Sequence, residues 1–147
     1  MIWELKHSVI ANADQASVWS WHSNVENWVR FEGNAIESIT LDGPFQAGTH
    51  MTTKMPGQDP RYSTLIKVEP PTHTVIEMQL SDAVLRFDWT FEALSDHQTR
   101  LTQRVILDGP KADAYVPFME QHFAPNIVPG MERIAEEIAK RFPGGQF

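Results

Sequence analysis

The fold of this chain is decided by residues 84–94, which read VLRFDWTFEAL. One face of the stretch is apolar and carries Leu85, Phe87, Trp89, Phe91 and Ala93. The other face is polar and carries Arg86, Asp88, Thr90 and Glu92. Successive side chains of a β-strand point to opposite faces of the sheet. The stretch therefore predicts an antiparallel strand with one buried face and one face in water.

Six more strands are predicted on either side, at residues 2–11, 34–41, 48–55, 60–69, 72–80 and 98–108. Turn-forming sequences separate the later ones: Asp42-Gly43-Pro44, Pro56-Gly57, Pro70-Pro71, Ser81-Asp82 and Ser95-Asp96. Connections this short cannot carry a parallel crossover, so the sheet is predicted to be an antiparallel meander. In the first strand, alternation places His7 on the buried face, between Leu5 and Val9.

Helical spacing appears twice. Residues 13–22 and 25–31 predict two short helices, with Asn12 as the N-cap of the first and Gln15 completing a capping box. Near the C-terminus, one apolar stripe steps by three or four residues through Val116, Met119, Phe123, Ile127, Met131, Ile134, Ile138 and Phe142. This stripe predicts a long helix that is kinked at Pro125 and Pro129 and is ended by Pro143-Gly144-Gly145.

These elements predict an α+β fold in which a curved seven-stranded antiparallel sheet wraps around the long C-terminal helix. A length of 147 residues predicts a single domain that spans residues 1–147. Where a curved sheet and a kinked helix do not meet fully, a cavity is expected between them. The apolar residues that we expect to line it are Met51, Met78, Phe87, Trp89, Phe91, Phe123, Ile127 and Met131.

Composition argues against several classes of function. Twelve basic and nineteen acidic residues give a net charge of −7, so nucleic acid is not an expected partner. The chain has no cysteine, and its six histidines form no HExxH motif, so we expect no metal site and no thiolate chemistry. No P-loop or GxGxxG motif indicates a cofactor. The absence of a long apolar run predicts no stable membrane insertion, and the expected location is the cytoplasm.

Six local motifs occur in an order that is similar to one superfamily. They are ADQASVW at 13–19, NVENW at 24–28, DGPFQAGT at 42–49, VEPP at 68–71, WTF at 89–91 and TRL at 99–101. Together with the order of elements, they resemble the START-like (SRPBCC) helix-grip superfamily, in its polyketide cyclase/dehydrase and lipid-transfer branch. The resemblance implies a deep hydrophobic cavity roofed by the C-terminal helix. It does not imply one reaction, because the superfamily includes both carriers and enzymes.

Three polar residues are candidates for contact with a ligand in that cavity. His7 and Gln103 are predicted to point inward, and Tyr115 lies near the start of the C-terminal helical region, where a cavity mouth is expected. A lone inward histidine is more often a hydrogen-bonded core residue than a catalyst. No pair of carboxylates indicates acid–base chemistry, and no catalytic residue is identified.

Two functions remain open from the sequence. In the first, the protein is a carrier or sensor of a small, mostly hydrophobic molecule. In the second, it is a polyketide cyclase/dehydrase-like enzyme that acts on an aromatic or lipid-like substrate, with His7, Gln103 and Tyr115 positioning it. The missing acid–base pair favours the first function. The sequence leaves the oligomeric state and the identity of the ligand open.

Overall fold

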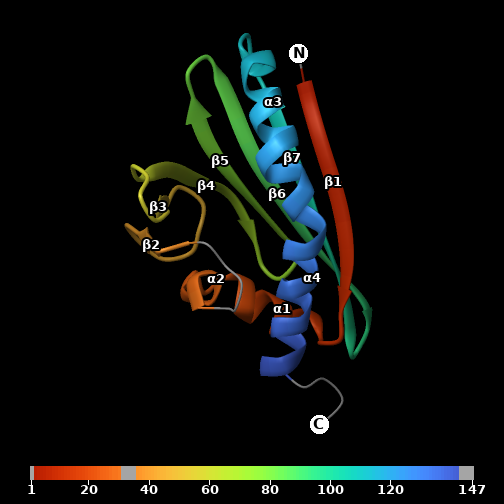
Figure 1. Cartoon of the computed structure of the whole chain (residues 1–147). Helices are drawn as coiled ribbons and strands as arrows, with labels where there is room; N and C mark the ends of the chain where they lie inside the picture. Colours follow the sequence, from red (N-terminus) through yellow and green to blue (C-terminus); the bar gives the residue numbers. More distant parts are fainter. Residues whose placement is uncertain (1, 31–35, 143–147) are drawn as a thin grey trace.

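Seven strands form one antiparallel sheet in the computed structural model, which describes residues 2–30 and 36–142 (Figure 1). The strands are β1 (Ile2–Ala11), β2 (Ser38–Leu41), β3 (His50–Lys54), β4 (Arg61–Glu69), β5 (His73–Leu80), β6 (Ala83–Ser95) and β7 (Gln98–Asp108). Their order across the sheet is β1-β7-β6-β5-β4-β3-β2, so β2 to β7 form the predicted meander and β1 pairs with β7. The predicted strand 34–41 is shorter than expected, because β2 begins at Ser38; residues 34 and 35 lie outside the described residues.

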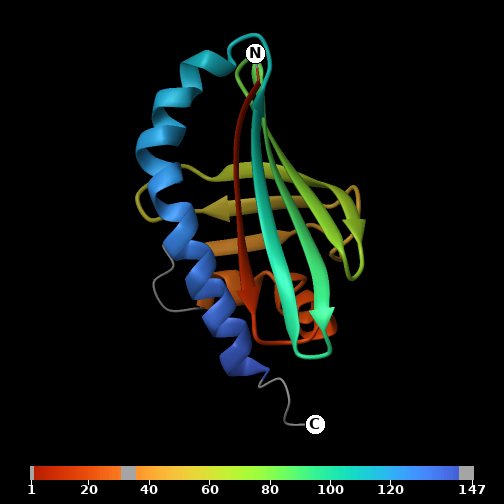
Figure 2. The ribbon, with the colours of Figure 1, turned by 90° about the vertical axis from the view of Figure 1, so that its right-hand side faces the viewer.

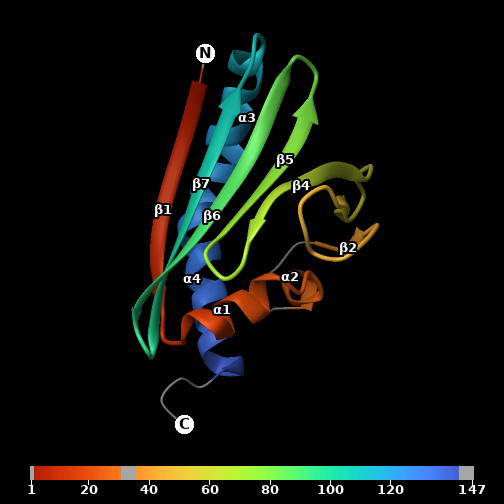
Figure 3. The same ribbon diagram turned by 180° about the vertical axis from the view of Figure 1, so that it is seen from behind.

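Helical segments follow β1 and β7. Two short helices, α1 (Gln15–His22) and α2 (Glu26–Arg30), lie at one end of the sheet. The C-terminal segment consists of a 3₁₀ turn η1 (Ala112–Tyr115), a short α3 (Val116–Phe118), a π-helical turn η2 (Met119–Phe123) and the long α4 (Ala124–Arg141). This segment lies along one face of the sheet, as the view from behind also shows (Figure 3).

The sheet is curved and wraps around α4. In Figure 2 the strands β2, β3 and β4 run across the direction of β1, β6 and β7. The pairing of β4 with β5 shifts register between Leu65 and Lys67, and such an irregularity bends a strand and increases its twist. The predicted curved sheet around a long C-terminal helix is therefore confirmed.

The predicted apolar stripe of the C-terminal helix faces the sheet. Ile127, Met131, Ala135 and Ile138 are buried, and Ile138 is fully inaccessible to solvent. At the C-terminal end of α4, the Arg141 guanidinium donates a hydrogen bond to the Asn27 side-chain oxygen on α2. Both contacts hold the helix against the rest of the fold.

The N-cap of the first helix differs from the prediction. Asp14, not Asn12, is the N-cap of α1, and its Oδ1 accepts a hydrogen bond from the Ser17 amide at 3.0 Å. The Gln15 side chain forms no capping box; it donates to the Phe91 carbonyl oxygen on β6. The Gln15 side chain therefore bonds to a distant strand and does not form the local helix cap that its sequence position predicted.

Pro125 and Pro129 do not break the C-terminal helix. Both prolines lie within α4, and the irregular backbone is the π-helical turn that immediately precedes Pro125. Proline lacks an N–H and crowds the preceding turn, so a wider π-type turn accommodates it without ending the helix. The Asn126 side-chain amide donates to the His122 carbonyl oxygen of this turn at 2.9 Å. The predicted interruption near Pro125 thus takes the form of a π-helical turn that leads into α4.

The outer face of the sheet is covered by cross-strand ion pairs. Arg104 forms two hydrogen bonds with the Glu4 carboxylate, at 2.7 and 2.8 Å, and holds the pKa of that carboxyl below its usual value. His73 begins β5, within the strand predicted over 72–80, and its Nε2 lies 2.6 Å from Asp88 Oδ1 on β6. Among the described residues, no helix is both long and apolar enough to cross a membrane.

Candidate functional site

Described residues line several cavities between the sheet and the C-terminal helical segment, and three of these cavities contain residues predicted for the site. The first, here the aromatic cavity, has a volume of about 150 Å³ and lies beside α1, α2 and the C-terminal half of α4. The second, the helix cavity, has a volume of about 210 Å³ and lies along the N-terminal half of α4. The third, the end cavity, has a volume of about 410 Å³ and lies at the far end of the sheet, below α3. Trp89 and Ile134 line both of the first two cavities, which therefore meet at this pair.

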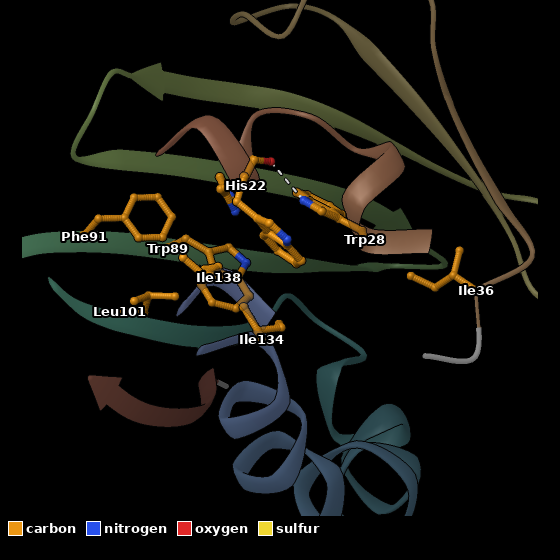
Figure 4. A pocket seen from close by; sticks show the side chains of 9 residues that line it. His22, Trp28, Ile36, Trp89, Phe91, Leu101, Ile134 and Ile138 are labelled. Carbon is orange, nitrogen blue, oxygen red and sulfur yellow. Dashed lines mark hydrogen bonds between the residues drawn. The ribbon is translucent and has the colours of Figure 1, made fainter. Parts of the chain in front are cut away.

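The aromatic cavity is walled almost entirely by apolar side chains (Figure 4). Its lining residues come from both short helices, two strands, α4 and the segment before β2, and they are Trp21, His22, Trp28, Ile36, Trp89, Phe91, Leu101, Ile134 and Ile138. No aspartate, glutamate, lysine or arginine is among the lining residues that the structure describes. A ligand here is held by ring faces and aliphatic groups, with His22 as the titratable group.

His22 is buried in a cluster of aromatic rings. Only 4% of its surface is exposed, and its ring centroid lies 4.8 Å from that of Phe91 and 5.2 Å from that of Trp28. The two ends of α1 fix this position: Asp14 caps the start, and the His22 carbonyl oxygen accepts a hydrogen bond from Trp28 Nε1 at 2.9 Å. The imidazole is consequently held at the wall of the cavity.

Burial keeps the His22 imidazole uncharged. It lowers the pKa of His22 from 6.5 to about 3, because a protonated ring in this apolar surrounding loses its hydration. Nε2 lies 2.8 Å from Thr74 Oγ1, and Thr74 is fully buried. Among the described residues, Nδ1 has no hydrogen-bond partner. The aromatic cavity therefore offers a neutral imidazole with one nitrogen free.

Polar groups of the inner face lie in one row across four strands. Thr74 on β5 pairs with Trp89 on β6, Trp89 pairs with Gln103 on β7, and Gln103 pairs with His7 on β1. All four side chains are on the same face, since residues at one register position of a sheet point the same way. The predicted inward orientation of His7 and Gln103 thus brings them side by side.

Gln103 is the polar residue of the helix cavity's sheet wall. Trp89, Phe123, Ile127, Met131 and Ile134 surround it on that cavity's lining, together with Asn126 and Gly130. The Gln103 side chain is 8% exposed, and its amide makes no hydrogen bond with the described residues. Its amide atoms therefore remain accessible on the cavity wall, where a bound ligand can form hydrogen bonds with them.

Replacing Gln103 with leucine should raise the free energy of unfolding by about 1 kcal/mol, because it places an apolar side chain in place of an amide at a position that is only 8% exposed. Urea denaturation followed by circular dichroism measures the change. Thr102→Val on the outer face of the same strand is the control; it should have no stabilising effect, because it deletes the Thr102 hydroxyl that pairs with Ser8 Oγ at 2.7 Å. If Gln103→Leu instead lowered the free energy of unfolding by a similar amount, the Gln103 amide would have to form hydrogen bonds in the folded protein.

Family comparison agrees with this geometry. The family model described as polyketide cyclase/dehydrase and lipid transport matches residues 3–140. The chain belongs to this polyketide cyclase/dehydrase family. No curated protein is significantly similar to it in sequence.

Solved structures share the helix-grip fold of this polyketide cyclase/dehydrase family member at low sequence identity. An aromatase/cyclase from Streptomyces sp. R1128 is 14% identical, with 96% of each chain covered and a TM-score of 0.78. Norcoclaurine synthase from Thalictrum flavum, in complex with dopamine and hydroxybenzaldehyde, is 10% identical over 95% of this chain and 88% of that chain, with a TM-score of 0.72. A protein from Thermobifida fusca is 16% identical over 93% of each chain, with a TM-score of 0.71.

Eight of the eleven residues predicted to form the site are distributed over the three cavities, whereas His7, Met51 and Phe87 are on none of the three described linings. Trp89 and Phe91 line the aromatic cavity, while Gln103, Phe123, Ile127 and Met131 join Trp89 in the helix cavity. Met78 and Tyr115 line the end cavity, where the Tyr115 hydroxyl bonds to the Ser81 backbone. Phe87 contacts Phe123 at a ring-centroid distance of 5.8 Å. Met51 lies apart, in a core cluster with Val25, Leu65 and Ile76.

Sequence reasoning missed the aromatic wall that α1, α2 and the C-terminal half of α4 contribute. His22, Trp28 and Ile138 are the main omissions. Both Trp21 and His22, neighbours at the end of α1, are buried. No group of three or more histidine or acidic side chains within the described residues is placed to hold a metal ion.

Proposed function

We propose that this protein binds a small, mostly hydrophobic molecule between its sheet and α4, as a carrier or sensor. The observation that carries the proposal is the aromatic cavity, whose described lining contains no charged side chain and one neutral imidazole. A concave, mostly apolar pocket with few polar groups is the usual form of a small-molecule site. Membership of a family described by lipid transport as well as by cyclisation is consistent with this role.

An enzyme that acts on an aromatic or lipid-like substrate is the alternative. The family description and the norcoclaurine synthase complex with dopamine and hydroxybenzaldehyde are the observations in its favour. The chemistry of the site favours binding instead. Efficient proton transfer needs a group whose pKa lies near the working pH, and burial lowers the pKa of His22 to about 3. His22 is therefore a weak base, and almost none of it is protonated near neutral pH.

Native mass spectrometry of the protein purified from its own host tests the proposal directly. A carrier or sensor should co-purify with a small molecule of defined mass. When that molecule is released and incubated with fresh protein, its mass should stay unchanged. Conversion of the released molecule into a product of different mass would establish the enzymatic alternative. Purified protein without any bound molecule, even after exposure to a host extract, would contradict both.

Trp89 should report on ligand entry, because it lines both the aromatic and the helix cavity. Titration with N-phenyl-1-naphthylamine, an uncharged apolar probe, should quench tryptophan emission. Trp89→Phe should lose the share of that response that comes from Trp89 while keeping the fold, and Trp21 and Trp28, which also line the aromatic cavity, should supply the rest. Trp3→Phe is the matched control. Trp3 is on the same sheet face but pairs with Leu107, four positions along β7 from Gln103, so its removal should leave the quenching largely intact. Equal loss in both variants would place the probe elsewhere.

A further inference from the structure

The volume of the aromatic cavity sets the size of what it can hold. An apolar cavity of about 150 Å³ accommodates one benzene-sized ring, and the aromatic cavity has a volume of about 150 Å³. A fused ring system or a long acyl chain would have to extend past Trp89 and Ile134 into the helix cavity. The aromatic cavity by itself therefore fits a single ring.

The lining side chains determine whether a polar, charged or apolar ring can bind in the aromatic cavity. Trp28, Trp89 and Phe91 present aromatic surfaces around the cavity, and Leu101 and Ile138 complete it with aliphatic groups (Figure 4). Aromatic walls stack against a flat ring, whereas an ionised group would be buried without a counter-charge in the described lining. The lack of charged side chains in the described lining therefore favours an uncharged ring.

His22 provides a polar atom that can orient the ring. Thr74 Oγ1 holds the His22 imidazole through Nε2 at 2.8 Å, and Nδ1 is left without a partner among the described residues. The tautomer decides whether Nδ1 accepts or donates a hydrogen bond. A hydroxyl group suits either tautomer, because it is both a donor and an acceptor.

Resting on the binding function proposed above, we infer that the aromatic cavity takes a single uncharged ring that bears a hydroxyl group, a phenol. His22 is the specificity-determining residue, because its free nitrogen bonds the hydroxyl. Thr74 is a positioning residue, because it fixes the imidazole and does not itself contact the ring. Any remaining part of the ligand extends past Trp89 and Ile134 toward Gln103.

Phenol and toluene test the inference, since they differ only by a hydroxyl in place of a methyl group. The quantity to compare is the ratio of the toluene Kd to the phenol Kd, measured by titration of methyl NMR signals of Leu101, Ile134 and Ile138. This ratio should fall about tenfold in His22→Phe, which corresponds to about 1.4 kcal/mol, while toluene affinity stays nearly unchanged. Thr74→Val should lower the ratio by a smaller factor, because the imidazole remains but loses its anchor.

A measurement on the unaltered protein guards against variants that do not fold. With ¹⁵N-labelled histidine, phenol should shift the His22 imidazole nitrogen signals, and toluene should leave them nearly in place. The phenol inference would be overturned if the ratio of the toluene Kd to the phenol Kd were the same in the unaltered protein, His22→Phe and Thr74→Val, and if phenol caused no nitrogen shift. The cavity would then still be a ligand site. Failure of both probes to move any of the three methyl signals would overturn the inference and the binding function together.

Discussion

A chain that ends after Ala124 should show no cooperative thermal unfolding transition. The truncation removes four buried side chains of α4, which are Ile127, Met131, Ala135 and Ile138. Burial of one Ile- or Met-sized side chain stabilises a protein by about 1.5–3 kcal/mol, and net stabilities are typically about 5–15 kcal/mol. The loss of three such side chains, about 4.5–9 kcal/mol, together with the Arg141–Asn27 hydrogen bond, is therefore comparable to the whole net stability of a typical domain. Calorimetry or circular dichroism measures the transition.

A chain that ends at Phe142 is the matched control and should melt as sharply as the full chain, because it keeps all of α4.

A milder change than the truncation replaces Ile138 with alanine. This side chain is fully buried and lines the aromatic cavity, so the substitution should cost about 2–5 kcal/mol. A sharp transition in the chain that ends after Ala124 would mean that the sheet and the short helices fold without α4.

Acid should destabilise this protein mainly through His22. The folded state holds the pKa of His22 at about 3, below its ordinary value of 6.5, so the unfolded state binds the proton more readily between these two values. The contribution of the neutral imidazole is fully present above pH 6.5 and is lost as the pH falls toward 3. At one pKa unit per 1.36 kcal/mol, lowering the pH to 5 removes about 2 kcal/mol of unfolding free energy.

His22→Phe isolates this contribution. Phenylalanine keeps a ring at the position, and the other titrating groups are unchanged, including the exposed Asp42 carboxylate, whose pKa His50 lowers. The difference in unfolding free energy between the two proteins should therefore shift by about 2 kcal/mol between pH 7 and pH 5, in favour of the variant at low pH. Urea denaturation at a series of pH values measures it. Parallel pH profiles for the two proteins would mean that the buried imidazole has an ordinary pKa.

Sequence periodicity determined most of the fold. Alternation along residues 84–94 is a local property of the chain, and Trp89 and Phe91 are buried where it placed them, while Thr90 and Glu92 are exposed. The stripe from Val116 to Phe142 likewise predicted the buried side of α4, because a helix repeats every 3.6 residues whatever surrounds it. Local pattern also placed His7 and Gln103 on the inner face, although not next to each other.

Tertiary structure decided the remaining features, which depend on contacts between distant residues. The Gln15 side chain suits a capping box by sequence but bonds to Phe91 O, 76 residues away. His22 meets Thr74 across 52 residues, and no spacing within α1 distinguishes it from an ordinary helix-face histidine. Its uncharged state follows from five rings that α1, α2, β6 and the segment between β2 and β3 bring together around it. The sequence by itself specified the sheet, the helix and the inward faces; only the packing of α1 against the sheet turned His22 into the polar centre of the candidate site.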